Sequence, residues 1–335
     1  MATLSDVAKA AGVSISAASR VLTEAPGARV SQATRERVKA AAAELKYRPN
    51  FAGRALKSSR THVIALVVPD LTNAFLTDLI LGVEKEAAAQ DYMLLLGRSE
   101  DIEGGGEMIS RLIGEGRVDG MLVQVGDTTT SEELGELVAA KQPITLNNSI
   151  EAGHRGGVVL PDEEGARVAT QHVIDLGHER IGFLGGLPHM YTAKRRLAGF
   201  KAAMGEAGLR VKRSYVTRHG YRPVDGVAAL AEVMTLGTPP TALVVANVNA
   251  AIGALREARR LGLTVPDDLS IISIHDAWTA ENTWPPLTAV KMPMYELGRT
   301  ATALLCRQLD GHPVDDHVVV DPPPQLIVRE STRSL

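Results

Sequence analysis

The chain has 335 residues, a formal net charge of −3 and one cysteine, Cys306, which excludes a disulfide within the chain. No apolar run approaches the length of a membrane span, and Met1 leads directly into a predicted helix without the apolar stretch of a secretion signal. Residues 1–60 carry eleven Lys or Arg and four Asp or Glu, a net +7, which leaves −10 for residues 61–335. A basic module joined to a larger acidic body indicates nucleic-acid contact at one end of the chain.

The first 21 residues have the pattern of two short helices joined by a tight turn. Thr3 and Asp6 have the spacing of a capping box, which predicts that a helix begins at Leu4. Gly12 is predicted to end this helix in the left-handed conformation, and Ser14 to cap the next one. The inward positions of the second helix are small or apolar: Ala17, Ala18 and Val21. This pattern is typical of a DNA-binding helix-turn-helix, although an ordinary helix hairpin has the same spacing.

The outward positions at the front of the second helix predict contacts with a DNA major groove. They are Ile15, Ser16, Ser19 and Arg20. Arg20 can bond O6 and N7 of a guanine, and Ile15 can touch a thymine methyl group. A plain phosphate contact by Arg20 remains the alternative.

A third helix is predicted after Ser31, and Pro49 ends the bundle. Its Val38, Ala42 and Leu45 are expected to close a small core. The next stretch, FAGRALKSSRT, has helical potential but little to bury.

The strings DVAKAAGVS, SRVL, TRERV and YRPN stand in an order and spacing that resemble the lactose repressor (LacI/GalR) family of bacterial transcriptional regulators. The resemblance covers nearly the whole chain. It implies a hinge helix after YRPN that folds on operator DNA, with Leu56 of each subunit inserted into the minor groove beside Arg54. A flexible basic linker is the alternative. Further backbone contacts are expected from polar side chains: Ser14, Ser19, Thr34 and Asn50.

Residues 61–335 read as alternating strands and helices. Continuous apolar runs predict buried parallel strands in two series. The first series is 63–69, 92–98, 120–125 and 143–148, and the second is 180–186, 215–220, 242–247 and 270–276. We therefore expect an α/β fold of two doubly wound parallel-sheet subdomains. The carboxyl ends of the strands in one subdomain should face those in the other across a ligand cleft.

The family resemblance implies the topology of periplasmic sugar-binding proteins, with three crossovers between subdomains near Pro161, Met292 and Pro323. The expected organisation is a helix-turn-helix domain at 1–48, a hinge at 49–60 and an effector-binding and dimerisation core at 61–335. Within the core, the N-subdomain is expected at about 61–161 and 292–323, and the C-subdomain at about 162–291 and 324–335.

Seven positions match the ligand residues of the family, and most of them follow a predicted strand. They are Phe75, Asn148, Thr192, Arg196, Tyr221, Asn247 and His275. Core packing of Phe75, a rim position for Tyr221 and a structural ion pair for Arg196 remain open as alternatives.

Three departures from the family pattern concern the charge of this site. The resemblance places acidic residues at His275, at Leu160–Pro161 and at Val248, and this chain has none at these positions. Because a buried cation without a counter-charge is costly, Arg196 suggests an anionic effector such as a sugar phosphate or a sugar acid. A substitution without electrostatic purpose, in a site for a neutral ligand, is the alternative.

No enzyme is expected, because the chain lacks the nucleophile-elbow, P-loop, dinucleotide-binding and zinc-protease motifs. Neither a cofactor nor a metal site is expected, and His172 and His178 are read as satisfied or exposed histidines. The resemblance implies a cytoplasmic, nucleoid-associated homodimer that binds a palindromic operator in double-stranded DNA and is controlled by a sugar or sugar derivative. A transporter-type solute-binding protein is the main alternative, and a regulator that responds to purines or other non-sugar ligands is a further one.

Overall fold

The computed structural model describes residues 2–22, 30–48, 60–98, 112, 114–124, 143–151 and 153–335. The chain divides into two compact units, Met1–Thr61 and His62–Leu335. Three residues with expected DNA contacts in the hinge region lie outside the described residues: Asn50, Arg54 and Leu56.

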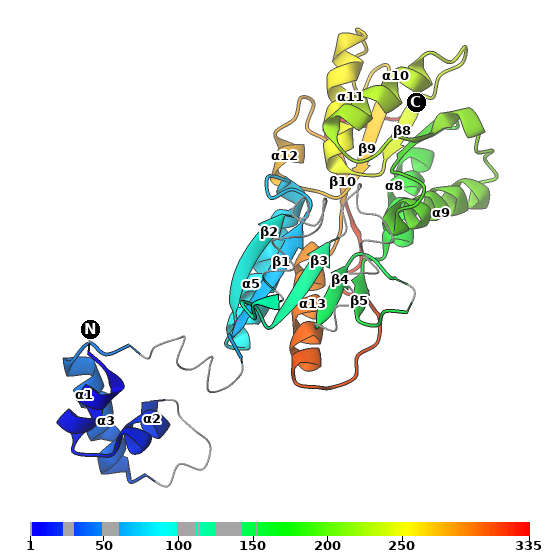
Figure 1. Cartoon of the computed structure of the whole chain (residues 1–335). Helices are drawn as coiled ribbons and strands as arrows, with labels where there is room; N and C mark the ends of the chain where they lie inside the picture. Colours follow the sequence, from blue (N-terminus) through cyan, green and yellow to red (C-terminus); the bar gives the residue numbers. More distant parts are fainter. Residues whose placement is uncertain are drawn as a thin grey trace. The chain divides into compact units, whose positions relative to one another are not determined.

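The first unit contains helices α1 (Leu4–Ala11), α2 (Ile15–Leu22) and α3 (Gln32–Glu44) (Figure 1). The Thr3 backbone N–H donates to the Asp6 carboxylate at 2.8 Å, and the Asp6 N–H donates to Thr3 Oγ1 at 3.3 Å. This capping box starts α1, and Gly12 ends it with φ 65°. Ser14 Oγ accepts from the Ala17 N–H at 3.1 Å at the start of α2. The predicted helix-turn-helix and its caps are confirmed.

The three helices share a small apolar core around Val7, Ala18, Val21 and Val38, all fully buried. The expectation for Leu45 is wrong, because its side chain is 36% exposed. Leu45 is the C-cap of α3, and it is not part of the apolar core that the three helices share.

The second unit is built on two six-stranded sheets (Figure 1). The first has the order β11-β5-β4-β3-β1-β2, and its strands are β1 (Val63–Val68), β2 (Met93–Arg98), β3 (Gly120–Gln124), β4 (Ile144–Asn147), β5 (Gly157–Val159) and β11 (His317–Val318). The second has the order β12-β10-β9-β8-β6-β7, and its strands are β6 (Ile181–Gly185), β7 (Val216–Arg218), β8 (Ala242–Val245), β9 (Ser270–Ile274), β10 (Thr288–Lys291) and β12 (Gln325–Ile327). All pairings are parallel except that of β10 with β12.

This architecture confirms the predicted fold class, and each predicted apolar run contains a strand. Strands β5 and β10, with three and four residues, lie outside the predicted series, and β11 has only two residues, too few to form an apolar run. We call the part built on the first sheet the N-subdomain and the part built on the second sheet the C-subdomain.

Helices and short 3-10 turns surround the sheets: η1 (Ala74–Leu76), α5 (Thr77–Ala89), α8 (Asp162–Asp175), α9 (Tyr191–Glu206), η3 (Arg213–Tyr215), α10 (Pro223–Met234), α11 (Val248–Arg260), α12 (Trp278–Glu281) and α13 (Met294–Leu309). Helix α5 packs on α13, α8 on α9 and α10 on α11. Glycines permit these close approaches: a methyl group at Gly253 of α11 would lie 1.9 Å from the carbonyl oxygen of Pro223. Among the described helices, none combines the length and the apolar character that crossing a bilayer requires.

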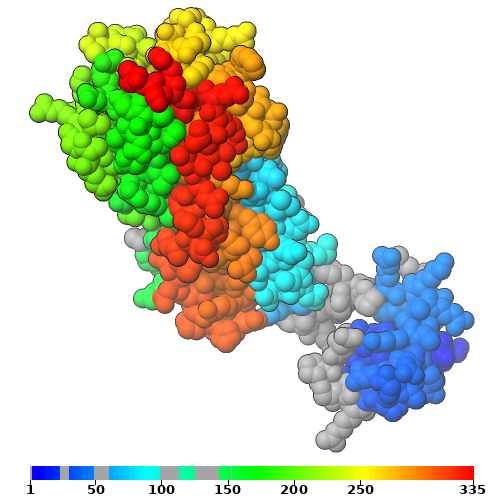
Figure 2. All heavy atoms as spheres, turned by 180° about the vertical axis from the view of Figure 1, so that it is seen from behind, coloured from blue at the N-terminus to red at the C-terminus, as the bar shows by residue number. Residues whose placement is uncertain are grey.

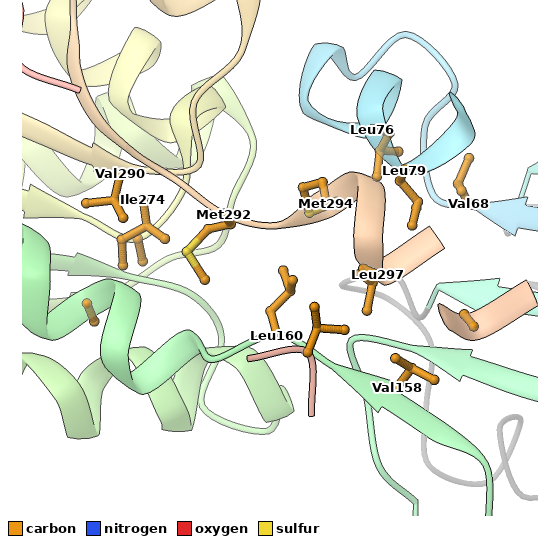
Figure 3. Close-up of a cluster of buried hydrophobic side chains, with 14 of the residues drawn as sticks. Val68, Leu76, Leu79, Val158, Leu160, Ile274, Val290, Met292, Met294 and Leu297 are labelled. Atoms are coloured by element: carbon orange, nitrogen blue, oxygen red, sulfur yellow. The ribbon is translucent and has the colours of Figure 1, made fainter. Parts of the chain in front are cut away.

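The chain passes between the two sheets three times, between β5 and α8, between β10 and α13, and between β11 and β12. A continuous apolar cluster fills this region (Figure 3). Ile274 belongs to the second sheet, Leu297 packs on the first, and Leu160 and Met292 lie between them. The two subdomains therefore share one core where the chain crosses, so a movement of one against the other must bend this region.

The C-terminal segment lies along the C-subdomain and covers part of its surface (red in Figure 2). Ser331 Oγ donates to the Ile271 carbonyl at 2.5 Å. His178 is 4% exposed, and its Nδ1 lies 2.9 Å from Thr241 Oγ1 while its Nε2 lies 3.1 Å from the Arg333 carbonyl oxygen. These contacts satisfy both ring nitrogens, in agreement with the interpretation of His178 as a satisfied structural histidine.

Candidate functional site

The guanidinium of Arg196 lies at the centre of a buried polar cluster in the second unit. Arg196 belongs to α9, and only 2% of its surface is exposed to solvent. Its Nε donates to Asp162 Oδ1 at 2.7 Å, its Nη1 donates to the Ala246 carbonyl at 2.6 Å, and its Nη2 lies 2.7 Å from His275 Nε2. Each of its three nitrogens therefore has a protein partner.

Parallel-sheet topology explains why these partners meet. Ala246 directly follows β8 and His275 directly follows β9, two neighbouring strands of the second sheet, whereas Asp162 is the first residue of α8, after the chain has crossed over from β5 of the first sheet. The carboxyl ends of parallel strands share one edge of the sheet, which is where ligands of such folds bind. Arg196 reaches this edge from α9, the helix that follows β6.

The partner Asp162 changes the charge of the site that the sequence predicts. The expectation that Arg196 lacks a counter-charge is wrong, because the fully buried Asp162 carboxylate pairs with it. Burial raises the pKa of Asp162, and Arg196 opposes that shift. Burial would lower the pKa of Arg196, but Asp162 and Tyr221 reverse the effect and raise it. The argument from a lone cation to an anionic effector therefore loses its premise.

His275 is held as a neutral imidazole between the two subdomains. Burial, and then the charge of Arg196, lower the pKa of His275 well below its usual value. Nε2 must then accept from Arg196, so that Nδ1 carries the hydrogen, and Nδ1 has no partner among the described residues. The centroid of its ring lies 4.7 Å from the ring centroid of Phe75, which belongs to the N-subdomain.

The pH dependence of stability tests this protonation state. The unfolded chain protonates His275 below about pH 6.5 while the folded chain does not, so lowering the pH from 6.5 destabilises the fold by up to about 1.4 kcal/mol per pH unit. Urea titrations between pH 7 and pH 5 should give a shallower pH slope for His275→Asn than for the wild type. His312→Asn, which replaces an exposed histidine, serves as the control. An unchanged slope in His275→Asn would show that His275 is not neutral in the fold.

The other predicted effector residues lie around this cluster. The Tyr221 hydroxyl is 3.0 Å from Thr192 Oγ1, and the Arg196 guanidinium is 5.3 Å from the centre of the Tyr221 ring. Asn148 Oδ1 accepts from the Leu160 N–H at 2.9 Å, and its side chain also lowers the pKa of Asp162. Hydrogen bonds and ring contacts thus join five of the seven predicted residues, and Asn148 interacts with the cluster through Asp162.

Asn247 differs, because its side chain has a structural task. Its Oδ1 accepts from the Asn249 N–H at 2.8 Å and caps α11. Asn249 in turn donates to Asn73 Oδ1 at 2.9 Å, which joins α11 of the C-subdomain to the N-subdomain.

Three residues of this region were missed by reading the sequence: Asp162, Asn73 and Asn249. A signal for Asp162 is present, since it follows the short strand β5, but the family pattern places the acid at the two positions before it. The bond between Asn73 and Asn249 joins residues 176 positions apart, and no local pattern predicts it.

We call the first unit, Met1–Thr61, the head. Its described residues that are predicted to read base edges lie on the surface of α2. Ile15 is 53% exposed, and Ser16 and Arg20 are exposed as well. Ser14 Oγ caps α2, and Thr34 Oγ1 lies 2.9 Å from Ser31 Oγ at the start of α3. Ser19 is partly buried. Helix α2 therefore presents an apolar, a hydroxyl and a cationic side chain on its exposed surface.

Comparison with known proteins gives two family matches and several close relatives. Residues 3–50 match the model of bacterial regulatory proteins of the lacI family, and residues 170–332 match a periplasmic binding protein-like domain. The HTH-type transcriptional repressor PurR of Vibrio campbellii is 32% identical over 338 residues, with complete coverage of both chains. A structure of the lac repressor dimer bound to operator and the anti-inducer ONPF is 26% identical, with a TM-score of 0.82 and 99% of each chain covered. A complex of the transcriptional regulator CelR with cellobiose is 29% identical, with a TM-score of 0.71, and covers 99% of this chain and 100% of that chain.

Proposed function

Because the chain belongs to the LacI family of bacterial regulatory proteins, and is a transcriptional repressor with an effector-binding domain rather than an enzyme, we propose that a sugar-type effector controls its affinity for a palindromic operator. The main support for sequence-specific operator binding is the exposure of three side chains on α2: Ile15, Ser16 and Arg20. Ser14, Ser19 and Thr34 serve as phosphate contacts that set the register. Leu56 inserts into the minor groove at the operator centre, Arg54 beside it holds phosphates, and Asn50 contacts the DNA backbone; this part of the proposal rests on the family resemblance.

The effector binds at the cluster around Arg196, beside Thr192, Tyr221 and His275 of the C-subdomain, and Phe75 of the N-subdomain. The remaining contacts come from Asn148 and from Asn247. Two observations support a sugar-type ligand: aromatic rings stand beside hydrogen-bonding groups, and the similar regulator CelR forms a complex with cellobiose.

Two exposed tryptophans support a homodimer. Trp278 is 64% exposed and Trp284 is 89% exposed, and both lie in or just after α12. Aromatic residues such as tryptophan are enriched at protein–protein interfaces relative to the rest of the surface. A dimer with two-fold symmetry places two heads on two half-sites, which is why the operator is expected to be an inverted repeat.

Control of DNA affinity follows from differential binding to two states of the core. The contact of Phe75 with His275 and that of Asn73 with Asn249 join the subdomains and exist only while these faces are together. A ligand that binds the two arrangements unequally shifts their populations, and the shift is transmitted to the heads.

The operator is found by selection of bound sequences from a pool of random duplexes with the full-length chain. The expected product is an inverted repeat. Enrichment of a direct repeat or of single half-sites would contradict the dimeric arrangement, and no enrichment would contradict sequence-specific binding.

Arg20→Ala should weaken binding to the selected operator by about 1–3 kcal/mol and relax the preference at one base pair of each half-site. Anisotropy titrations with the operator and with all four bases at that position measure both effects. Arg37→Ala, which removes an exposed cation of α3 from the same basic unit, serves as the control. An equal loss on operator and on random DNA would show that Arg20 only contacts phosphate.

A further inference from the structure

We infer that Asp162 sets the charge of the effector: by neutralising Arg196, it makes the site accept an uncharged, hydroxyl-bearing molecule and reject anions. This inference rests on the proposed effector site and adds a specificity-determining residue to it. Its basis is the Arg196 network of this chain, in which Asp162 supplies the negative charge.

The first argument concerns the hydrogen-bonding capacity of the guanidinium. All three of its nitrogens are already in contact with protein acceptors, at 2.6 to 2.7 Å. An arginine that binds a phosphate or a carboxylate presents two parallel N–H groups to it. An anion that displaces none of these partners meets only the two remaining N–H groups, one on Nη1 and one on Nη2.

The second argument concerns charge. The side chains of Arg196 and Asp162 are 3% and 0% exposed, so solvent screens their fields only weakly. An anion that approaches Arg196 therefore also meets the carboxylate 2.7 Å from Nε. Attraction of the anion by Arg196 is therefore largely cancelled by repulsion from Asp162. The free-energy cost of removing the anion from water is then not offset.

The third argument concerns the polar atoms that remain. Asp162 Oδ2 and His275 Nδ1 are buried and have no hydrogen-bond partner within the described part of the chain. The first accepts a hydrogen bond, and the second donates one in the tautomer that Arg196 imposes. A hydroxyl group satisfies either atom, whereas a phosphate or a carboxylate would be repelled by the first.

The test uses inorganic phosphate as the anionic probe and the full-length chain. The melting temperature is measured against potassium phosphate concentration at constant pH, with potassium chloride at equal ionic strength as the control. A ligand that binds the folded state raises the melting temperature in a saturable way. The wild type should respond to phosphate no more than to chloride.

Asp162→Asn keeps the shape and an acceptor oxygen but leaves Arg196 without a counter-charge. It should bind phosphate at least about tenfold more tightly than the wild type does, and the added substitution Arg196→Gln should abolish this gain. Asp162→Ser is a second neutral variant in case Asp162→Asn gives no melting transition. If neither variant folds, the wild type and Arg196→Gln decide the question.

Two results would overturn the inference. One is saturable stabilisation of the wild type by phosphate that disappears in Arg196→Gln. The other is a folded neutral variant at position 162 that gains no phosphate binding. Operator binding by the same wild-type preparation separates this failure from that of the proposed function, since a protein that binds operator and also phosphate refutes only the charge rule.

Discussion

Asp162→Ala should lower the free energy of unfolding by about 3–5 kcal/mol, the cost of leaving a buried charge without its partner. Arg196 would keep its contacts with Ala246 and His275, but neither is an anion, since His275 is neutral. Chemical denaturation at pH 7 measures the change. Because the loss arises from the unpaired cation, adding Arg196→Met to the same chain should recover part of it.

Glu163→Ala is the matched control for this measurement. It removes a carboxylate one residue further along α8, which pairs with Arg195 at 2.9 Å. Both side chains of that pair are about half exposed, at 51% and 42%, so the expected loss is only about 0–1 kcal/mol. Equal small losses for the two alanine variants would show that the pair of Asp162 with Arg196 contributes no more than a surface contact.

Gly253→Ala should destabilise the fold by about 3 kcal/mol, although alanine is the better helix former. A methyl group at this position of α11 would lie 1.9 Å from the Pro223 carbonyl oxygen at the start of α10. The opposite glycine has the same role, because a methyl at Gly226 would lie 1.9 Å from the Ala250 carbonyl oxygen. Backbone atoms cannot rotate away as a side chain can, so the two helices must separate and lose their contact.

Gly205→Ala in α9 is the matched control, and it is expected to stabilise the fold instead of destabilising it. No atom lies within 4 Å of the methyl group that it adds. The lower backbone entropy of the unfolded chain and the better helix propensity should stabilise the fold by up to about 1 kcal/mol. Thermal or urea unfolding of both variants decides the matter. A neutral or stabilising effect of Gly253→Ala would mean that α10 and α11 do not approach as closely as described.

Local patterns in the sequence predicted most of the fold. The capping box of Thr3 with Asp6, the turn at Gly12 and the apolar runs of the sheets each depend on neighbouring residues, and each is present in the structure. Leu45 is exposed although its spacing from Val38 and Ala42 predicts burial, because helical periodicity does not tell how far along a helix its packing partners reach. The two residues of β11 leave too short a pattern to detect.

The candidate site could be predicted only in part. Residues that follow strands, such as His275, were identified because topology places them at one edge of a sheet. The partner of Arg196 could not be predicted from the sequence, because the pairing with Asp162 depends on how α8 and α9 pack. That pairing reverses the inference about effector charge, which shows that a list of site residues does not fix their net charge.

The most direct test of the proposed function compares the full-length chain on the selected inverted repeat and on a scrambled duplex of equal composition. Anisotropy titrations at several salt concentrations give both affinities and their salt dependence. A repressor of this kind should prefer the inverted repeat by about 10³-fold or more, and should lose affinity for both duplexes as salt rises. Equal affinity for the two duplexes, or binding to neither, would contradict the proposal that the basic head reads an operator.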